Sequence, residues 1–287
     1  MRGRTLGLAW LALTAGLLTA AGGGSAAPQA RAVVPDPVPC AGLACWDPEP
    51  TTEPWQLQLQ GAIDLSVPAP VYDLDLDSAE GVVDAIHAQG DRAICYMSAG
   101  TYEAFRDDAD EFPHRVLGKR LERFDNERWL DIRKLELLKP IMEARLDRCQ
   151  AKGFDAADPD NVDGYQNGTG FPLRKRHQLE YNAWIANAVH ERGMAVGLKN
   201  DLGQAERLLP YFDFAVNEQC FQYHECGVLD PFVAAGKPVY GVEYRVGRAR
   251  FCERSIAHGF STIKKRFGLM AFRKTCPPAP SGRARGR

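Results

Sequence analysis

Polar residues that could take part in chemistry close nearly every apolar run of this chain. In chain order they are Asp73, Asp75, Tyr96, Ser98, Asp158, Asp160, Asn161, Asp163, Lys199, Asn200, Asp201, Asn217, Glu218, Gln219, Glu243, Tyr244 and Arg273. Five of the runs contribute carboxylates, and in AVNEQC and YGVEY the acid abuts residues that look buried, where a stray charge would be costly to desolvate. Glycoside hydrolysis uses such acids: one protonates the leaving oxygen while another stabilises or attacks the oxocarbenium-like centre.

Other chemistries lack their sequence signatures. Ser98 lies in YMSAG rather than in G-x-S-x-G, and the chain has no P-loop motif. The six histidines show no H-x3-H or H-E-x-x-H spacing. DPDNVDG resembles the start of a calcium loop at Asp158, but Val162 occupies its fifth position and Thr169 its twelfth, where Glu is needed. We therefore expect no metal and no cofactor.

The elements that would position these residues alternate along the chain. Strands are predicted at 55–61, 71–76, 92–100, 153–161, 194–201, 212–220, 237–244 and 267–273, and helices within 78–90, 130–153, 177–193, 205–212, 229–236 and 255–266. Several helical patterns end in glycine directly before the next strand, as helix C-caps do. This alternation predicts an α/β fold of class (β/α)8, a TIM barrel in a single domain. An open doubly wound sheet is the alternative, but its G-x-G-x-x-G turn is absent.

A TIM barrel places its active site at the carboxyl ends of its strands, so the polar residues would meet at one mouth. The period of 2 in VYDLDL puts Asp73 and Asp75 on one face, which points inward if the leucines meet the helices. Aromatic residues near strand ends could stack on sugar rings; they are Tyr96, Tyr102, Tyr165, Tyr223 and Tyr244.

The N-terminus has the layout of a secretory signal peptide. Arg2 and Arg4 precede an apolar run over 6–21, and small residues follow up to Ala27. A retained membrane anchor is the alternative, but the run falls short of the roughly 20 apolar residues that a span needs. We expect cleavage of residues 1–27 and a secreted, extracellular protein without a membrane segment.

Export makes disulfides the default interpretation of the eight cysteines. Cys40 with Cys45 and Cys220 with Cys226 could close short loops, Cys252 and Cys276 bracket the last elements, and Cys95 and Cys149 remain. Eight cysteines allow 105 pairings, so spacing does not prove the connectivity. Zinc ligation is the alternative, but no C-x2-C occurs.

Composition completes the outline of the protein. Residues 28–54 form a Pro-rich extension, 55–276 the barrel and 277–287 a tail predicted to be disordered. The chain has 35 Lys and Arg against 37 Asp and Glu, a net charge of −2, which disfavours a nucleic-acid partner.

The order of motifs resembles one enzyme family. ICYMSAG, ERWLDIR, PDNVDGY, NGTGF, GLKND, NEQCFQYHEC and GKPVYGVEY follow one another between Trp55 and Tyr244 as in the endo-α-1,4-polygalactosaminidases, which are secreted TIM-barrel glycoside hydrolases. The resemblance implies hydrolysis of α-1,4-linked galactosamine-rich polysaccharide, with Asp160 and Glu218 as the catalytic acids. The family usually has Glu-Pro-Asp-Asn where this chain has Asp158, which keeps the charge on a shorter side chain.

The site predicted from these arguments has a catalytic pair and a lining. Asp160 is expected to be the ionised nucleophile or stabiliser and Glu218 the general acid, although spacing alone does not select Asp160 over Asp158 or Asp163. The predicted substrate-binding residues are Asp73, Asp75, Tyr96, Ser98, Asn161, Asp163, Lys199, Asn200, Glu243 and Tyr244. Two alternatives stay open: a barrel that binds amino-sugar polysaccharide without cleaving it, and a hydrolase of another amino-sugar polymer. We expect a monomer.

Overall fold

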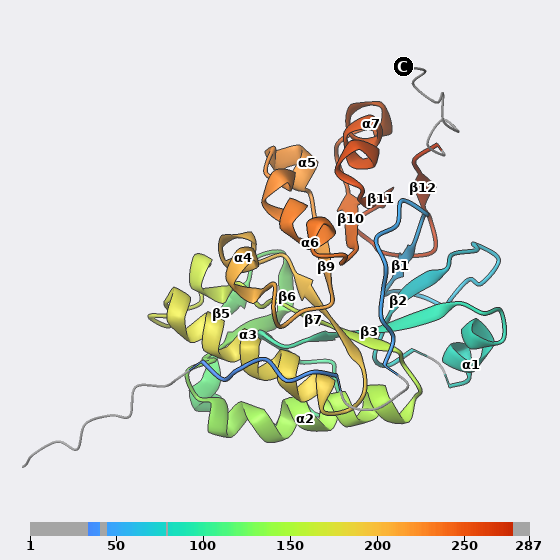
Figure 1. Cartoon of the computed structure of the whole chain (residues 1–287). Helices are drawn as coiled ribbons and strands as arrows, with labels where there is room; N and C mark the ends of the chain where they lie inside the picture. Colours follow the sequence, from blue (N-terminus) through green and yellow to red (C-terminus); the bar gives the residue numbers. More distant parts are fainter. Residues whose placement is uncertain (1–33, 41–44, 79, 278–287) are drawn as a thin grey trace, which may run out of the picture. The chain divides into compact units, whose positions relative to one another are not determined.

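The computed structural model describes residues 34–40, 45–78 and 80–277 (Figure 1). The predicted signal peptide and nearly all of the predicted tail lie outside these residues. Within the described residues, none of the helices combines the length and the apolar character that a membrane crossing requires.

The fold is mixed α/β and is built on one curled, nine-stranded sheet. Its strand order is β1 (Gln56–Gln58), β2 (Val71–Asp75), β3 (Arg92–Ser98), β7 (Ala156–Asp160), β8 (Ala195–Lys199), β9 (Phe214–Glu218), β10 (Val239–Glu243), β11 (Ser261–Lys264) and β12 (Lys274–Thr275). The first eight strands pair in parallel, and β12 pairs antiparallel with β11. The parallel order predicted from strand and helix alternation is confirmed for the first seven predicted strands.

Helices connect the strands on the outer side of the sheet. They are α1 (Val82–His87), α2 (Leu135–Ala151), α3 (Lys175–His190), α4 (Ala205–Leu208), α5 (Cys220–Tyr223), α6 (Asp230–Ala234) and α7 (Arg248–His258). Short 3-10 helices lie at Ala109–Glu111, His114–Val116, Gly164–Gln166, Leu202–Gln204 and Cys226–Leu229. The long helices α2 and α3 pack against each other beside the sheet (Figure 1). The four glycines predicted to end helices, Gly90, Gly153, Gly193 and Gly236, all have positive φ.

The predicted eighth strand is wrong. The helix predicted over 255–266 ends at His258, because Gly259 adopts φ 76° as its left-handed cap, and the β-branched segment that follows forms β11. Residues 267–273 are a loop rather than a strand. Arg273 therefore does not end a strand, and its guanidinium donates to the carbonyls of Trp55 and Pro68 at 2.7 Å each.

A small antiparallel sheet between β3 and α2 was not predicted. It has the order β4 (Thr101–Glu103), β6 (Phe124–Leu130) and β5 (Leu117–Leu121). Apart from the buried end of β6, strands β5 and β6 are exposed or only partly buried and rich in charge, so they lack the apolar alternation that marks a half-buried strand. This hairpin forms part of the candidate site.

Apolar side chains fill both sides of the curled sheet. Trp55, Leu57, Val71, Phe214 and Tyr240 belong to the inner cluster. A larger outer cluster joins the sheet to the helices and includes Tyr72 and Leu74 of β2. Because residues alternate along β2, the acids of that strand share the inner face with Val71, as the period of 2 predicts.

Side chains connect the residues at β1 with β10 and with the residue that follows β11. Trp55 Nε1 donates to the Gly241 carbonyl at 3.4 Å, and Lys265 Nζ donates to Gln56 Oε1 at 3.2 Å. No strand pairing joins β1 to β11 in the described part of the chain. The strand order thus agrees with the predicted barrel, and its full closure stays a prediction.

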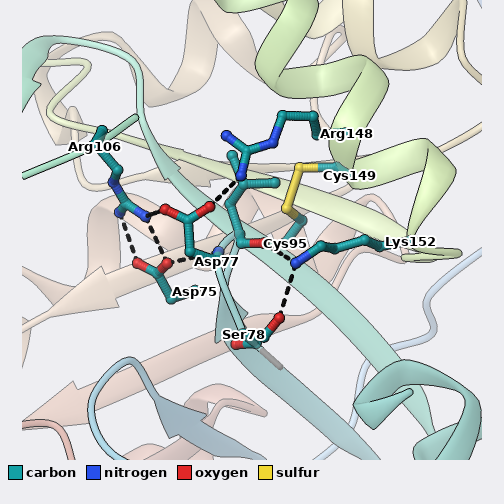
Figure 2. The surroundings of a disulfide bond; sticks show 9 residues. Asp75, Asp77, Ser78, Cys95, Arg106, Arg148, Cys149 and Lys152 are labelled. Atoms are coloured by element: carbon teal, nitrogen blue, oxygen red, sulfur yellow. Dashed lines mark hydrogen bonds and ion pairs between the residues drawn. A yellow bond between two sulfur atoms is a disulfide. The ribbon is translucent and has the colours of Figure 1, made fainter. Parts of the chain in front are cut away.

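Four disulfides join the eight cysteines. The pairs are Cys40–Cys45, Cys95–Cys149, Cys220–Cys226 and Cys252–Cys276, so the pairing that spacing favoured is confirmed. The second of these ties strand β3 to helix α2 (Figure 2). The third closes the short segment directly after β9, where Glu218 lies.

Candidate active site

A cavity of about 880 Å³ opens at the carboxyl ends of the strands. Its wall includes Asp160, the last residue of β7, and Glu218, the last residue of β9. One strand, β8, separates β7 from β9 in the sheet. Parallel strands bring their carboxyl ends to the same edge of the sheet, so the two acids enter one cavity from positions two strands apart.

Asp160 is surrounded by hydrogen-bond donors and one cation. The Tyr96 hydroxyl donates to its Oδ2 at 2.7 Å, and Lys199 Nζ lies 3.4 Å from its Oδ1. Burial, followed by the negative charge of Asp160, raises the pKa of Tyr96 well above its ordinary value, so the phenol stays a neutral donor. Asp160 is thus held between a hydroxyl donor and an ammonium group.

Lys199 neutralises a buried group of acids beneath the cavity. Its ammonium lies 3.4 Å from Asp158 Oδ2, and its side chain is only 2% exposed. Burial alone would lower the pKa of Lys199, but the surrounding carboxylates raise it well above its ordinary value. Burial raises the pKa of Asp158 to about 6 against the opposing effect of Lys199. Burial and then the charge of Asp158 raise the pKa of Asp73 well above its usual range.

Glu218 has a different environment from Asp160. The Tyr244 hydroxyl donates to Glu218 Oε1, and the Glu218 backbone amide donates to Asn200 Oδ1 at 3.0 Å. Asn200 also accepts a hydrogen bond from Asn217 at 3.3 Å. Among the described residues, no basic side chain forms an ion pair with Glu218 within 4.0 Å. These contacts hold the carboxylate in place, and the Lys199 ammonium acts on Glu218 only from beyond ion-pair distance.

The backbone turns sharply directly after β7, β8 and β9. Asn161, Asn200, Asp201 and Gln219 all have positive φ, between 40° and 68°. Asn and Asp tolerate this left-handed conformation better than most residues, and such strained positions cluster at functional sites. The opposing loop is equally constrained, because a Cβ at Gly100 would lie 1.8 Å from the Asn161 carbonyl oxygen. Only glycine fits there without moving the loop that follows Asp160.

A network of charges borders the cavity on the β2 side. Arg106 donates to both oxygens of Asp75, at 2.6 and 2.7 Å, and to Asp77 at 2.7 Å. Figure 2 shows Arg148 of α2 reaching Asp77 next to the Cys95–Cys149 disulfide. The disulfide fastens α2 to β3, and the Arg148–Asp77 ion pair fastens α2 to the loop after β2.

Comparison with known proteins decides the family. The model of glycoside-hydrolase family GH114 matches residues 38–279. The chain belongs to family GH114. The resemblance found in the motifs is thereby confirmed, and the protein is a glycoside hydrolase.

Two solved structures are similar to this chain, and the first supports its assignment to GH114. Ega3 of Aspergillus fumigatus, crystallised in complex with galactosamine, is 35% identical and aligns with a TM-score of 0.77 over 80% of this chain and 97% of that chain. The glycoside hydrolase domain of PelA from Pseudomonas aeruginosa is 14% identical, with a TM-score of 0.63 over 77% of this chain and 98% of that domain. The second likeness shows a shared fold only. Curated proteins yield no match to this chain.

Most of the predicted binding residues of this GH114 chain lie on the cavity wall. Those that do are Asp75, Tyr96, Asn161, Asp163, Lys199, Asn200 and Tyr244. Burial, followed by the charge of Asp160, raises the pKa of Asp163 to about 6. Of the five tyrosines considered for stacking, Tyr96 and Tyr244 line the cavity, and the exposed Tyr223 does not.

The structure places three predicted binding residues beneath the cavity wall. Asp73 is fully buried within the group around Lys199. Ser98 is buried, and its Oγ accepts a hydrogen bond from Asn161 Nδ2 at 3.0 Å. Glu243 accepts from the backbone amides of Phe221 and Gln222 at 2.8 and 3.3 Å. Their contacts support neighbouring residues of the site.

One acid on the cavity wall was missed. Glu127 belongs to β6, and its Oε2 accepts a hydrogen bond from Thr101 Oγ1 at 3.0 Å. Burial, with Glu103 as the next contribution, raises the pKa of Glu127 to about 7. No strand was predicted in this segment, so sequence gave no reason to place Glu127 near Asp160.

The described residues offer no metal site. No group of three or more His, Cys, Asp or Glu among them is arranged to hold a metal ion. The acids that gather around Lys199 have that ammonium as their counter-charge instead.

Proposed function

We propose that this GH114 protein is a secreted hydrolase of α-1,4-linked galactosamine-rich polysaccharide, with Asp160 and Glu218 as its catalytic acids. The observation that carries the proposal is the position of these two carboxylates, which close β7 and β9 and line one cavity. The similarity to Ega3, which was crystallised with galactosamine, supports the substrate class.

The contacts of the two acids differ in a way that supports different roles. Asp160 accepts a hydrogen bond from Tyr96 and lies beside the Lys199 ammonium, which stabilises negative charge. We assign it the role of nucleophile or electrostatic stabiliser of the oxocarbenium-like centre. Glu218 accepts from Tyr244 and has no paired cation, so it is better suited to carry a proton to the leaving oxygen.

The charge of the cavity favours a cationic sugar. Seven acidic residues line it, against three basic residues, Arg106, Arg123 and Lys199. Unacetylated galactosamine carries an ammonium group, which such a wall attracts. We therefore expect binding of partly deacetylated polymer to weaken as salt is raised, because exposed attraction is screened over about 8 Å at physiological ionic strength.

The proposal includes two further features of the protein. The four disulfides support export, since such bonds persist in oxidising compartments. The side-chain contacts between Trp55 and Gly241 and between Lys265 and Gln56 support closure of the eight parallel strands into a barrel.

The test is to incubate the secreted protein with partly deacetylated polygalactosamine and, separately, with polyglucosamine, and to size the products. We expect shortening of polygalactosamine alone. Shortening of polyglucosamine instead would favour a hydrolase of another amino-sugar polymer. Binding of polygalactosamine without any shortening would indicate the non-catalytic alternative and contradict the proposal.

A further inference from the structure

Large apolar side chains are exposed around the mouth of the cavity. Six such residues are strongly exposed in the described part of the chain: Phe105, Phe124, Tyr223, Val228, Phe267 and Met270. Four of them, Phe105, Phe124, Phe267 and Met270, line the same cavity as the two carboxylates. Exposed apolar residues scattered singly need no explanation, whereas a concentration at one opening marks a binding surface.

The four residues form two groups on different loops. Phe105 and Phe124 belong to the segment after β3 that contains the small antiparallel sheet, and Phe267 and Met270 belong to the loop after β11. Strands β7, β8, β9 and β10 separate β3 from β11 in the sheet order. The apolar groups therefore flank the cavity at separate places, with the acids of β7 and β9 between them in the sheet order.

The group after β11 is fixed in its exposed position. The Leu269 carbonyl accepts from the backbone amide of Leu59 at 2.9 Å, and Lys265 Nζ donates to the Met270 carbonyl at 2.7 Å. Phe267 stacks on Tyr244 with ring centroids 4.5 Å apart and an interplanar angle of 19°. One face of Phe267 is thus covered while its side chain stays 55% exposed. The Tyr244 hydroxyl in turn donates to Glu218, so Tyr244 alone lies between the Phe267 ring and the proposed acid.

The group on the hairpin side has a similar arrangement. The Arg106 guanidinium lies 5.1 Å from the Phe105 ring centroid and covers one face of a side chain that is 60% exposed. Phe124 begins β6 and pairs with Leu121 across the turn, and it is 56% exposed. Glu127, on the same strand as Phe124, brings a carboxylate to the cavity wall.

We infer that Phe124 and Phe267 are stacking platforms for sugar residues on either side of the cleavage point, so that the protein holds a polymer across its cavity rather than a single sugar. The inference rests on the proposed function, because it assigns further subsites to the same substrate. The apolar faces of hexosamine rings stack on aromatic rings, while the acids between the platforms attract their ammonium groups. A cavity of about 880 Å³ exceeds the needs of one sugar ring, since roughly 300–1,000 Å³ encloses a whole drug-sized ligand.

The experiment measures kcat/KM against substrate length for Phe124→Ala and Phe267→Ala, using α-1,4-galactosamine oligosaccharides of increasing size and the polymer. Each substitution should lower kcat/KM on the polymer roughly ten-fold, the effect of one ring contact. On the shortest oligosaccharide that the wild type cleaves, kcat/KM of each variant should fall by less than about two-fold, because this substrate does not reach the substituted ring. Tyr223→Ala, which removes an exposed ring outside the cavity, is the matched control and should change neither value.

Three results separate failure of this inference from failure of the proposed function. An equal fractional loss at every substrate length would overturn the platforms, because Phe267 would then act only through Tyr244 and Glu218. Unchanged kcat/KM in both variants would also overturn them. A wild-type protein that cleaves no galactosamine polymer would contradict the proposed function, and affinity electrophoresis in polygalactosamine gels would then test the platforms. Weaker retardation of both Phe variants than of Tyr223→Ala would support them, and equal retardation would overturn them.

Discussion

Replacing Lys199 by methionine should destabilise the protein by an amount that grows with pH. The Lys199 ammonium lies 3.4 Å from Asp158 and 3.4 Å from Asp160, and the side chain is buried. Methionine keeps an unbranched apolar chain but removes the charge. The fully buried Asp158 carboxylate then loses its cation.

The size of the effect follows from the contact distance. One pair of unit charges 3.4 Å apart contributes about 5 kcal/mol at an effective dielectric constant of about 20, which corresponds to about 3.6 pKa units. Burial already raises the pKa of Asp158 to about 6 with Lys199 present. In the variant this carboxyl stays protonated to well above pH 8. An acid whose folded-state pKa is raised loses stability as pH rises, so the variant should lose about 1.4 kcal/mol more than wild type for each pH unit above 6.

Urea unfolding at pH 6 and pH 8 measures this difference. Because wild-type Asp158 is itself half titrated at pH 6, the loss caused by Lys199→Met should be about 2.3 kcal/mol greater at pH 8 than at pH 6. Lys265→Met is the matched control, because Lys265 is buried but bonds to Gln56 and the Met270 carbonyl rather than to an acid. Burial lowers the pKa of Lys265 to about 8, so its effect should change by less than about 0.5 kcal/mol over the same interval. An equal loss at both pH values for Lys199→Met would refute the assigned charge balance.

Two further substitutions test the framework of the site. Replacing Cys95 and Cys149 by serine opens a 54-residue loop and should lower the free energy of unfolding by about 4 kcal/mol, against about 2 kcal/mol for Cys40 and Cys45, which lie five residues apart. Urea unfolding of the two double variants measures this, and equal losses would count against it. Gly100→Ala should destabilise by about 1–3 kcal/mol and lower kcat, because the new Cβ would lie 1.8 Å from a backbone oxygen next to Asp160. Thermal unfolding and polymer hydrolysis test it, and wild-type values in both would contradict the close approach.

The strand order was predictable because its signals are local. Each buried strand is a short apolar run, and the glycines at helix ends adopt the positive φ that such caps need. Polar residues at the ends of β7 and β9 stand out against these runs, and the family resemblance then singled out Asp160 and Glu218 among them. Their order in the sheet then follows from the regular alternation of strand and helix.

The last strand was misplaced for a physical reason. The segment FGLMAFR is as apolar as a buried strand, yet Phe267 and Met270 are 55% and 59% exposed at the cavity mouth. A periodicity argument assumes that apolar residues are buried, and this assumption fails for this segment. The strand itself lies in STIK, where Gly259 had already ended the helix.

Contacts between distant segments could not be predicted. Spacing alone did not separate Asp160 from Asp158, whereas the structure shows that Asp158 is fully buried and Asp160 reaches the cavity. Glu127 enters the cavity on a charged hairpin whose pattern resembles an exposed connection. The pairing of Lys199 with two acids depends on neighbouring strands and carries no signature within one segment.

Turnover of Asp160→Asn and Glu218→Gln on partly deacetylated polygalactosamine tests the central claim most directly. Both substitutions keep the shape of the side chain and remove its charge or its proton. General acid–base assistance is worth roughly 10²- to 10⁴-fold, so each variant should lose at least about 100-fold in kcat while unfolding like wild type. Asp147→Asn, in an exposed ion pair with Arg192 away from the cavity, is the control and should keep full turnover. A variant of either acid that keeps more than about a tenth of wild-type kcat would contradict the assignment.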